Sequence, residues 1–556
     1  MKSGLEIAQD AVLRPIADIV AAAGIEEGEL EPYGRYRGKV DLSAMERLAG
    51  LPDGKLVVTT AITPTKAGEG KTTTSISLTQ GLGKIGQRVV LCLREPSMGP
   101  VFGIKGGGTG GGYAQVVPME DINLHFNGDF HAVTAAHNLL AAAIDASIYF
   151  GNTLGIDAGS ITWPRTLDVN DRELRYTVVG LGGKPHGVPR ENSFVITAAS
   201  EIMAVLALSS DLQDLRSRLG RIVIGDTVEG KPVTAEDLKV AGAMAVVMKD
   251  AIKPNLVQTL EGQPVLIHAG PFGNVAHANN SIVEDRIALK LADYVVTEGG
   301  FASDLGFQKF ADIVCRFGGF VPSAAVLVAT VRALKSHGGM AFEDLATEDL
   351  DALRRGSENL AAHVDIVKAY RLPCVVAINR FPTDTDKEVT LVDELATQVG
   401  AERVVVNEGF GRGGEGAVDL ARAVVEACDG SSAFSQLSPP GTPIKEQVEA
   451  IATRLYGADG VDYLPQAEKD IARMESLGFG QYPVCMAKTQ LSLSHDPTLL
   501  NRPRGWRLPV RGVVPSAGAG FVVVLCGNMQ RMPGLGRTPA FMNIDIDRDG
   551  RTVGLY

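Results

Sequence analysis

Residues 63–74 read Thr63-Pro64-Thr65-Lys66-Ala67-Gly68-Glu69-Gly70-Lys71-Thr72-Thr73-Thr74. The apolar run before them, Leu56 to Ile62, is typical of a buried strand, and the pattern from Thr72 to Gly83 is typical of a helix. In a strand–loop–helix unit of this kind, glycines let backbone N–H groups face phosphate oxygens, and the helix N-terminus adds positive potential. The string therefore predicts a nucleotide-binding phosphate loop.

Within this loop, Lys71 is expected to reach the terminal phosphates and Thr72 to bind Mg²⁺. The match to GxxxxGK[ST] is incomplete, because Thr65 stands where the first glycine is usual, and Lys66 precedes Lys71 by five residues, as in the deviant Walker loops of dimeric partner-switching ATPases. A glycine-rich turn that opens an ordinary helix is the alternative. The residues expected to bind ATP are Thr65, Lys66, Ala67, Gly68, Glu69, Gly70, Lys71 and Thr72.

The same alternation of apolar run, polar loop and helical pattern recurs along the chain and predicts an α/β fold with a parallel sheet. Covering helices are expected over Ala198 to Leu219 and Leu345 to Tyr370, and a linker over Asp429 to Gly441, followed by a helix from Ile444 to Tyr456. Ligands of such sheets bind beyond the carboxyl ends of the strands. The expected strands are Leu56 to Ile62, Val89 to Leu93, Val265 to Ile267, Tyr294 to Val296, Val375 to Ile378 and Val404 to Val406.

Composition and charge narrow the class of protein. The 556 residues suggest two or three domains, and 45% hydrophobic with 21% charged residues is ordinary for a globular protein. A net charge of −12 argues against a bulk attraction to nucleic acid or anionic membrane. The six cysteines contain no CxxC pair, and neither a signal peptide nor a run of ~20 apolar residues is present. We therefore expect a reduced, cytoplasmic protein.

Two features follow the run Val89 to Leu93. Arg94 and Glu95 come at the expected strand end beside the phosphate loop, where an arginine can bind a carboxylate or phosphoryl group through two N–H groups; a surface ion pair is the alternative.

The tract Gly103-Ile104-Lys105-Gly106-Gly107-Gly108-Thr109-Gly110-Gly111-Gly112-Tyr113 holds a dense set of glycines. Such backbone suits close approach to a ligand or a neighbouring chain, and a mobile surface loop is the alternative.

Histidines near these features are further candidates. His125 and His131 are six residues apart and do not share a helix face, so a zinc site is not indicated. Together with Asp129 they could position a small substrate or accept a proton, and a hydrogen-bonded polar core explains the spacing equally well. His268, after another expected strand, has the same two interpretations.

Longer strings carry a family resemblance over essentially the whole chain. The sequence resembles the formate–tetrahydrofolate ligase family (10-formyltetrahydrofolate synthetase), in its monofunctional form. The strings are Leu5-Glu6-Ile7-Ala8-Gln9, Leu93-Arg94-Glu95-Pro96-Ser97, residues 117–126 (VPMEDINLHF), residues 328–339 (VATVRALKSHGG), Asn379-Arg380-Phe381-Pro382-Thr383-Asp384-Thr385 and Met532-Pro533-Gly534-Leu535.

Three strings depart from the family's usual pattern. Gly108-Thr109 stands where two alanines are usual, and residues 297–306 read TEGGFASDLG in place of TEAGFGADLG. Phe410 replaces the Trp that often precedes the GGEG string. These changes concern folate affinity and loop rigidity more than the type of reaction.

The resemblance implies an ATP-dependent ligation of formate to tetrahydrofolate through formyl phosphate, in one-carbon metabolism. It implies that Lys71, Arg94 and His268 bind formyl phosphate, and that Glu95 lies near a monovalent-cation site for ammonium or potassium. Asp129, with His125 or His131, would handle the proton or the orientation of the amine.

Phe381 and Phe410 each follow an expected strand, so two aromatic rings could sandwich the flat pterin of the folate; packing in the core is the alternative for either. The expected ligands are Mg-ATP, formate and tetrahydrofolate, free or polyglutamylated, with no redox cofactor.

The resemblance also implies a P-loop-containing nucleotide-hydrolase-like parallel sheet domain over 1–345 and two smaller α/β domains. These cover 346–435, which contributes to the folate site, and 436–556. A homotetramer without nucleic acid or membrane partners is expected. Two other functions compete with this one: a P-loop ligase acting on another small carboxylate, and a nucleotide-switched protein that binds a macromolecule.

Overall fold

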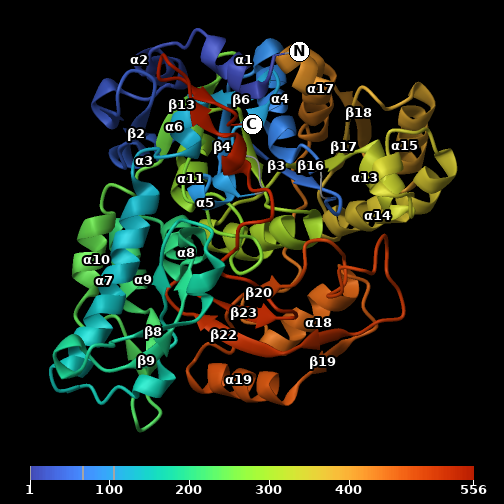
Figure 1. Ribbon diagram of the computed structural model, residues 1–556. Coiled ribbons are helices and arrows are strands. Elements are labelled where there is room, and N and C mark those ends of the chain that lie inside the picture. The colour runs from blue at the N-terminus through green and yellow to red at the C-terminus, as the bar shows by residue number, and fades with distance from the viewer. Residues whose placement is uncertain (1, 66–67, 104–106, 556) are drawn as a thin grey trace.

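The computed structural model describes residues 2–65, 68–103 and 107–555. Within them, the chain forms one 12-stranded sheet, a smaller three-stranded sheet and several two-stranded ribbons. Helices cover both faces of the large sheet (Figure 1). The predicted α/β class is therefore confirmed.

The middle of the large sheet is parallel, and every expected strand falls in it. One strand, β16, was not predicted from the sequence. It lies between β3, which precedes the phosphate loop, and β17. From one side to the other the order is β14 (Pro264–Ile267), β4 (Val89–Leu93), β15 (Tyr294–Glu298), β3 (Lys55–Ala61), β16 (Ala324–Ala329), β17 (Cys374–Asn379) and β18 (Arg403–Asn407).

The other edge of the sheet is antiparallel, which differs from the purely parallel sheet that we expected. β13 (Asn255–Thr259) runs antiparallel to β14, and also pairs antiparallel with β2 (Gly38–Val40) and β6 (Ala114–Val117). Only residues 260–263 join β13 to β14, too few for a crossover helix, so the two strands form a hairpin. The large sheet is therefore mixed. β1 (Leu30–Pro32) ends this edge, and the short β5 (Gly110–Gly111) pairs with β6.

Alternate residues of the parallel strands point to opposite faces, which explains their continuous apolar character. Leu56 and Val58 of β3 belong to one core, and Val57 belongs to the other. The first core is covered by α11 (Ile282–Leu291), α13 (Val331–His337), α14 (Leu350–Ala369) and α15 (Asp386–Gln398); the second by α4 (Lys71–Lys84) and α17 (Val418–Ala427).

A further group of helices extends the molecule beyond the sheet. An arm at the lower left of Figure 1 contains α7 (Asp129–Tyr149), α8 (Glu201–Leu208), α9 (Leu212–Gly220), α10 (Ala241–Met248) and the hairpin of β8 (Thr177–Val179) and β9 (Arg190–Asn192). The single helix expected over 198–219 is thus two helices, because the Asp211 side chain caps the N-terminus of α9. Shorter helices are α1 (Gly4–Asp10), α2 (Ile16–Ala23), α3 (Ser43–Leu48), α5 (Met98–Phe102), α6 (Met119–Asn123), α12 (Cys315–Gly318) and α16 (Gly409–Arg412).

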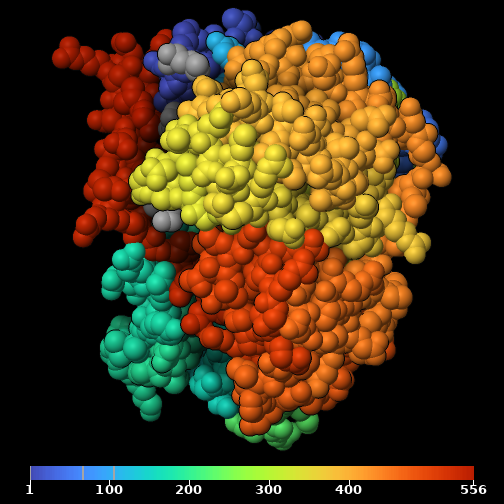
Figure 2. All heavy atoms as spheres, turned by 90° about the vertical axis from the view of Figure 1, so that its right-hand side faces the viewer, coloured from blue at the N-terminus to red at the C-terminus, as the bar shows by residue number. Residues whose placement is uncertain are grey.

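Residues after the predicted linker form a C-terminal lobe. It is built from α18 (Ile444–Arg454), α19 (Pro465–Ser476) and a sheet of β20 (Val484–Ala487), β23 (Phe521–Leu525) and β22 (Gly512–Ser516). The lobe lies against the helical layer of α13 and α14, as Figure 2 shows, and its apolar residues join the first core. The chain then returns to its beginning, where Leu555 packs with Leu5.

Three further observations concern the domain division, the helices and the cysteines. β17 and β18, from the region 346–435, continue the same sheet as β3, so the division at 345 and 435 stays a prediction. Among the described residues, no helix combines the length and the apolar character needed to cross a bilayer. All six cysteines are buried and unpaired.

A buried ion pair joins α13 to α15. Lys335 Nζ lies 2.8 Å from Glu388 Oε1, and neither side chain is exposed. The same ammonium group donates to the Thr347 carbonyl at 2.9 Å. Burial alone would raise the pKa of Glu388, but its hydrogen bond from Lys335 keeps the pKa below the ordinary value.

We expect Lys335→Met to lower the free energy of unfolding by about 3–5 kcal/mol, because Glu388 is left as an uncompensated buried charge. Adding Glu388→Gln should recover part of the loss. The exposed pair of Arg216 and Glu236 offers a matched control, since Arg216→Met should lower the free energy of unfolding far less, because water solvates both of these groups. Urea unfolding measures all three, and equal losses for Lys335→Met and Arg216→Met would contradict the prediction.

Candidate functional site

The phosphate loop leaves β3 and enters α4 in the middle of the parallel sheet. Gly68 and Gly70 have φ of 72° and 70°, a conformation that favours glycine, and Gly70 is the N-cap of α4. The helix begins at Lys71, one residue before the predicted start. Lys66 and Ala67, both expected to bind ATP, lie outside the described residues.

Glu69 stabilises the shape of this loop. Its Oε1 accepts hydrogen bonds from the backbone N–H and the hydroxyl of Thr65, at 2.8 and 2.9 Å. Its other oxygen accepts from the hydroxyl of Thr330, at the N-terminus of α13. The Glu69 side chain is buried and ties Thr65 to Thr330, so both of its carboxylate oxygens are already used within the protein.

The charged groups of the site meet at Glu298, the last residue of β15. Lys71 Nζ lies 2.9 Å from Glu298 Oε2, and the Thr72 hydroxyl donates to the same oxygen at 3.0 Å. On the other side, Arg94 Nη2 lies 3.5 Å from Glu298 Oε1. The structure therefore brings the predicted Lys71, Thr72 and Arg94 together around one carboxylate.

Glu298 was not among the site residues predicted from the sequence. The available signal was an acid at the end of the strand run Tyr294 to Val296, within the string that starts at Thr297. β15 lies between β4 and β3, so its end faces both Arg94 and the phosphate loop. Only the strand order reveals that position.

Burial shapes the charges of this cluster. It would raise the pKa of Glu298, but the nearby Lys71 and Arg94 outweigh it and the pKa lies below the ordinary value. Burial lowers the pKa of Lys71, against the opposing charge of Glu298. Arg94 Nε is buried and makes no hydrogen bond to the described part of the chain. Two cationic side chains around one carboxylate give this cluster an excess of positive charge, which suits an anionic ligand.

Glu95 lies beside a second buried cluster, formed by Lys39, Asp129 and Asn255. Lys39 Nζ lies 2.7 Å from Asp129 Oδ1, with side chains 1% and 2% exposed, and Asn255 Nδ2 donates to Asp129 Oδ2 at 2.7 Å. Glu95 Oε2 is buried without a hydrogen-bond partner in the described residues. Burial, followed by the charge of Asp129, raises the pKa of Glu95 well above its ordinary value. Both carboxylate oxygens of Asp129 are thus bonded within the protein, whereas Glu95 Oε2 has no such bond in the described residues and could bind a cation.

The three histidine candidates lie in different surroundings. His125, between α6 and α7, and His131, in the first turn of α7, are exposed. His268 is fully buried: its Nε2 lies 2.6 Å from the Ala251 carbonyl oxygen, and its Nδ1 lies 2.6 Å from the Ser281 hydroxyl. Burial lowers the pKa of His268 to about 4. Both of its ring nitrogens are therefore occupied within the protein.

The two phenylalanines follow β17 and β18, as expected. The Arg332 guanidinium lies over the ring of Phe381, 3.7 Å from its centroid, and Arg332 Nη2 donates to the Gly68 carbonyl at 2.8 Å. Phe410, in α16, is 55% exposed. One face of Phe381 is thus covered by a cation beside the phosphate loop, while Phe410 remains accessible.

Part of the glycine tract packs against Phe410 in the same chain. The Tyr113 N–H donates to the Phe410 carbonyl at 2.9 Å, and a Cβ on Gly111 would lie 3.2 Å from the Phe410 ring. Gly112 has a φ of 58°, and a Cβ there would collide with the Phe410 carbonyl oxygen. Glycine is required here for close backbone approach, and residues 104–106 of the tract lie outside the described residues.

Two asparagines that we had not singled out connect these parts. Asn379, the last residue of β17, donates from Nδ2 to the Glu69 carbonyl and accepts at Oδ1 from the Thr74 hydroxyl, both at 2.8 Å. Asn407, the last residue of β18, donates to Asn379 Oδ1 at 2.8 Å. These amides join the phosphate loop to the strands that precede Phe381 and Phe410.

Comparison with known proteins identifies the family to which the chain belongs. The family model described as formate–tetrahydrofolate ligase matches residues 2–556. A formate–tetrahydrofolate ligase of Desulforamulus reducens is 55% identical over 562 residues, with 100% of this chain and 99% of the relative covered. One of Symbiobacterium thermophilum is 54% identical over 557 residues, with both chains fully covered. The chain therefore belongs to the formate–tetrahydrofolate ligase family.

Proposed function

We propose that this protein ligates formate to tetrahydrofolate at the expense of ATP, giving 10-formyltetrahydrofolate, ADP and phosphate. The observation that carries the proposal is the meeting of Lys71, Thr72 and Arg94 at Glu298, beside the phosphate loop. This cluster can receive two anions in one place, which the reaction requires. The P-loop character of residues 63–72 and the cytoplasmic location are part of the same proposal.

The chemistry explains why two anions must meet. A formate oxygen attacks the γ-phosphorus of ATP, a new O–P bond forms, and the bond to the β-phosphate oxygen breaks, releasing ADP. The N10 amine of the folate then attacks the formyl carbon, phosphate leaves, and the amine loses a proton. Two unit charges at ~4 Å repel by about 4 kcal/mol at an effective dielectric of ~20, so cationic groups must offset this repulsion.

Lys71 and Arg94 are the groups that we assign to this task. Lys71 would contact the terminal phosphates, and Arg94 would bind formate and then formyl phosphate. When these anions arrive, they would share the two cations with Glu298. The Thr72 hydroxyl would hold the Mg²⁺ that accompanies ATP, and the neighbouring Glu298 carboxylate supplies a second oxygen of the kind that Mg²⁺ prefers. His268 is left out of this assignment because both of its ring nitrogens are occupied.

The monovalent cation, ammonium or potassium, would bind near Glu95. The unpartnered, buried Oε2 of Glu95 beside Asp129 supports this site, because a cation would offset the cost of two neighbouring acids. With Asp129 held by Lys39 and Asn255, we assign it an orienting role. The exposed imidazoles of His125 and His131 are the candidates for accepting the amine proton.

Phe381 and Phe410 would hold the pterin ring between them. Phe410 is accessible, and Phe381 is fixed by the Arg332 guanidinium, which also contacts the phosphate loop. The folate would thereby lie next to the phosphoryl groups. We further propose that the protein works as a homotetramer; exposed apolar side chains on the arm, such as Phe150 and Tyr176 at 80% each, support association between copies.

The first experiment is ADP release with Mg-ATP, with and without formate and with and without tetrahydrofolate. We expect turnover only with both, and at least 10³-fold less with Lys71→Ala, which removes the charge that meets the terminal phosphates. Lys84→Ala, at the exposed far end of α4, is the matched control. ATP hydrolysis that ignores formate and tetrahydrofolate would refute the proposed reaction, and full turnover by Lys71→Ala would refute the role of the loop.

Arg94→Ala should abolish formate-dependent phosphate transfer while ATP still binds, because the arginine acts on the carboxylate and not on the adenine nucleotide. Formate-dependent ADP release and the ATP dissociation constant measure the two effects separately. Arg94→Lys, which keeps the charge but loses the planar fork, should recover only part of the rate. Unchanged formate-dependent release in Arg94→Ala would contradict the assignment.

Phe410→Ala should chiefly raise the KM for tetrahydrofolate, by roughly five- to tenfold, since one stacking face is lost. Steady-state kinetics with each substrate varied in turn measures the change. Phe150→Ala removes a ring on the arm that is 80% exposed, more than Phe410, and should leave this KM unchanged. An unaffected KM in Phe410→Ala would mean that the ring serves packing against Gly111 and Gly112.

A further inference from the structure

The phosphate loop begins at Thr63, and each polar group of this residue is bonded to a helix from elsewhere in the chain. Its N–H donates to Asn359 Oδ1 at 3.2 Å, and its hydroxyl lies 2.9 Å from His363 Nε2. Its carbonyl accepts from His337 Nε2 at 3.0 Å. Thr63 is 1% exposed, so the start of the loop is held from three directions.

Two of these partners also bind the C-terminal lobe. His337 Nδ1 accepts from the Asn501 N–H at 3.3 Å, and Asn359 Nδ2 donates both to the Thr63 hydroxyl at 3.0 Å and to the Asn501 carbonyl at 2.9 Å. His337 is thus a bridge with one donor and one acceptor. A neutral imidazole has this pair of groups, and burial, which lowers the pKa of His337, favours that form.

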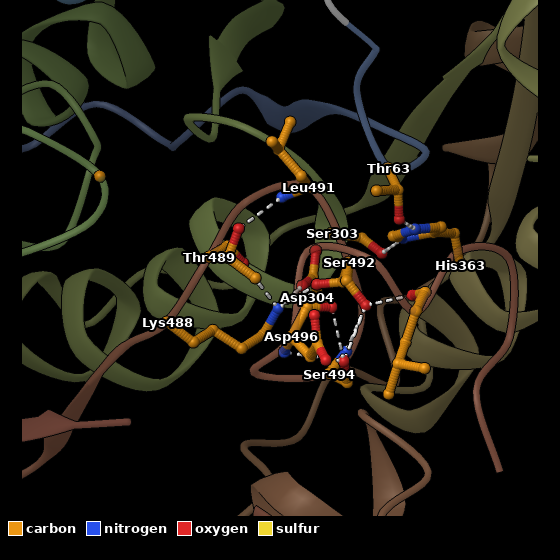
Figure 3. Close-up of polar contacts among 12 residues, drawn as sticks. Thr63, Ser303, Asp304, His363, Lys488, Thr489, Leu491, Ser492, Ser494 and Asp496 are labelled. Carbon is orange, nitrogen blue, oxygen red and sulfur yellow. Dashed lines mark hydrogen bonds and ion pairs between the residues drawn. The ribbon is translucent and has the colours of Figure 1, made fainter. Parts of the chain in front are cut away.

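The third partner reaches the same lobe through a second route, seen in Figure 3. His363 Nδ1 lies 2.7 Å from the Ser303 hydroxyl, and the next residue, Asp304, pairs with Lys488 Nζ at 2.6 Å. The side chains of Lys488 and Asp304 are 0% and 2% exposed. Lys488 Nζ also donates to the Ser492 carbonyl at 2.6 Å, so it shapes the turn that follows β20.

We propose that residues 488–502, the docking segment, position the phosphate loop for ATP, with His337 as the positioning residue. Lys488 anchors one end of the docking segment and Asn501 the other. Both ends act on Thr63, where the rigid strand β3 gives way to the loop. Holding the loop in its binding shape lowers the conformational cost of nucleotide binding. The C-terminal lobe thereby contributes to ATP affinity; this inference rests on the proposed function of the loop.

The test is ADP binding by isothermal titration calorimetry, which needs no turnover. His337→Leu removes both bonds of the bridge, and we expect the ADP dissociation constant to rise roughly five- to tenfold, with the KM for ATP following it. The KM values for formate and tetrahydrofolate should stay within twofold of the parent. His337→Gln, which keeps an N–H for the Thr63 carbonyl, should bind ADP more tightly than His337→Leu.

His137 provides the matched control. It is also buried, in the arm, and its ring nitrogens lie 2.8 Å from the Ser200 hydroxyl and 3.0 Å from the Pro164 carbonyl oxygen. His137→Leu should lower the Tm as His337→Leu does, yet keep the parent's ADP affinity. If His337→Leu also keeps it, the bridge serves stability alone and the proposal is overturned.

A second pair of variants changes Asn501, within the docking segment itself. This pair tests the proposal even if His337→Leu does not fold. Asn501 has a φ of 66° and donates from Nδ2 to the Arg355 carbonyl at 2.8 Å. Asn501→Gly and Asn501→Ala both lose this bond, but only glycine adopts the backbone conformation without strain. We expect Asn501→Ala to bind ADP several-fold more weakly than Asn501→Gly, and equal affinities would overturn the proposal.

Failure of this inference is distinguishable from failure of the proposed function. Normal turnover and ADP affinity in Lys71→Ala would remove the loop as the ATP site and the inference with it. If Lys71→Ala is inactive while the His337 and Asn501 variants bind ADP like the parent, the loop assignment stands and only the role of the docking segment is refuted.

Discussion

A single buried carboxylate, that of Glu298, holds the charged part of the site together. Lys71, Thr72 and Arg94 come from α4 and from the loop after β4, and all three contact it. Without it, two cations would face each other in a poorly solvated place, where like charges repel strongly. Glu298 thus offsets the charges of Lys71 and Arg94 and orients both side chains before any anionic substrate is present.

The parallel order of the sheet makes this meeting possible. β4, β15, β3, β17 and β18 all end at the same edge, so their following residues converge although they are far apart in the chain. Asn379 and Asn407 use that edge to fasten the phosphate loop to the ends of β17 and β18. The segments that carry Phe381 and Phe410 are thereby fixed relative to the groups that would bind phosphate.

The phosphate loop depends on more than its own glycines. Glu69 closes it internally, and Thr63 is held by residues of α13 and α14. Those residues in turn contact the C-terminal lobe at Asn501. Buried polar networks of this kind favour one conformation, because breaking a hydrogen bond within them leaves a buried polar group unpaired. The lobe and the loop are in this sense one structural unit.

The sequence by itself determined the α/β class, the strand and helix of the phosphate loop, and the strand ends that carry Arg94, Phe381 and Phe410. These features depend on local periodicity and on glycine, which act over a few residues. Tertiary structure alone decided that Glu298 unites Lys71 with Arg94, that β16 separates β3 from β17, and that both nitrogens of His268 are occupied. Such facts depend on strand order and on contacts between distant residues, which no local pattern encodes.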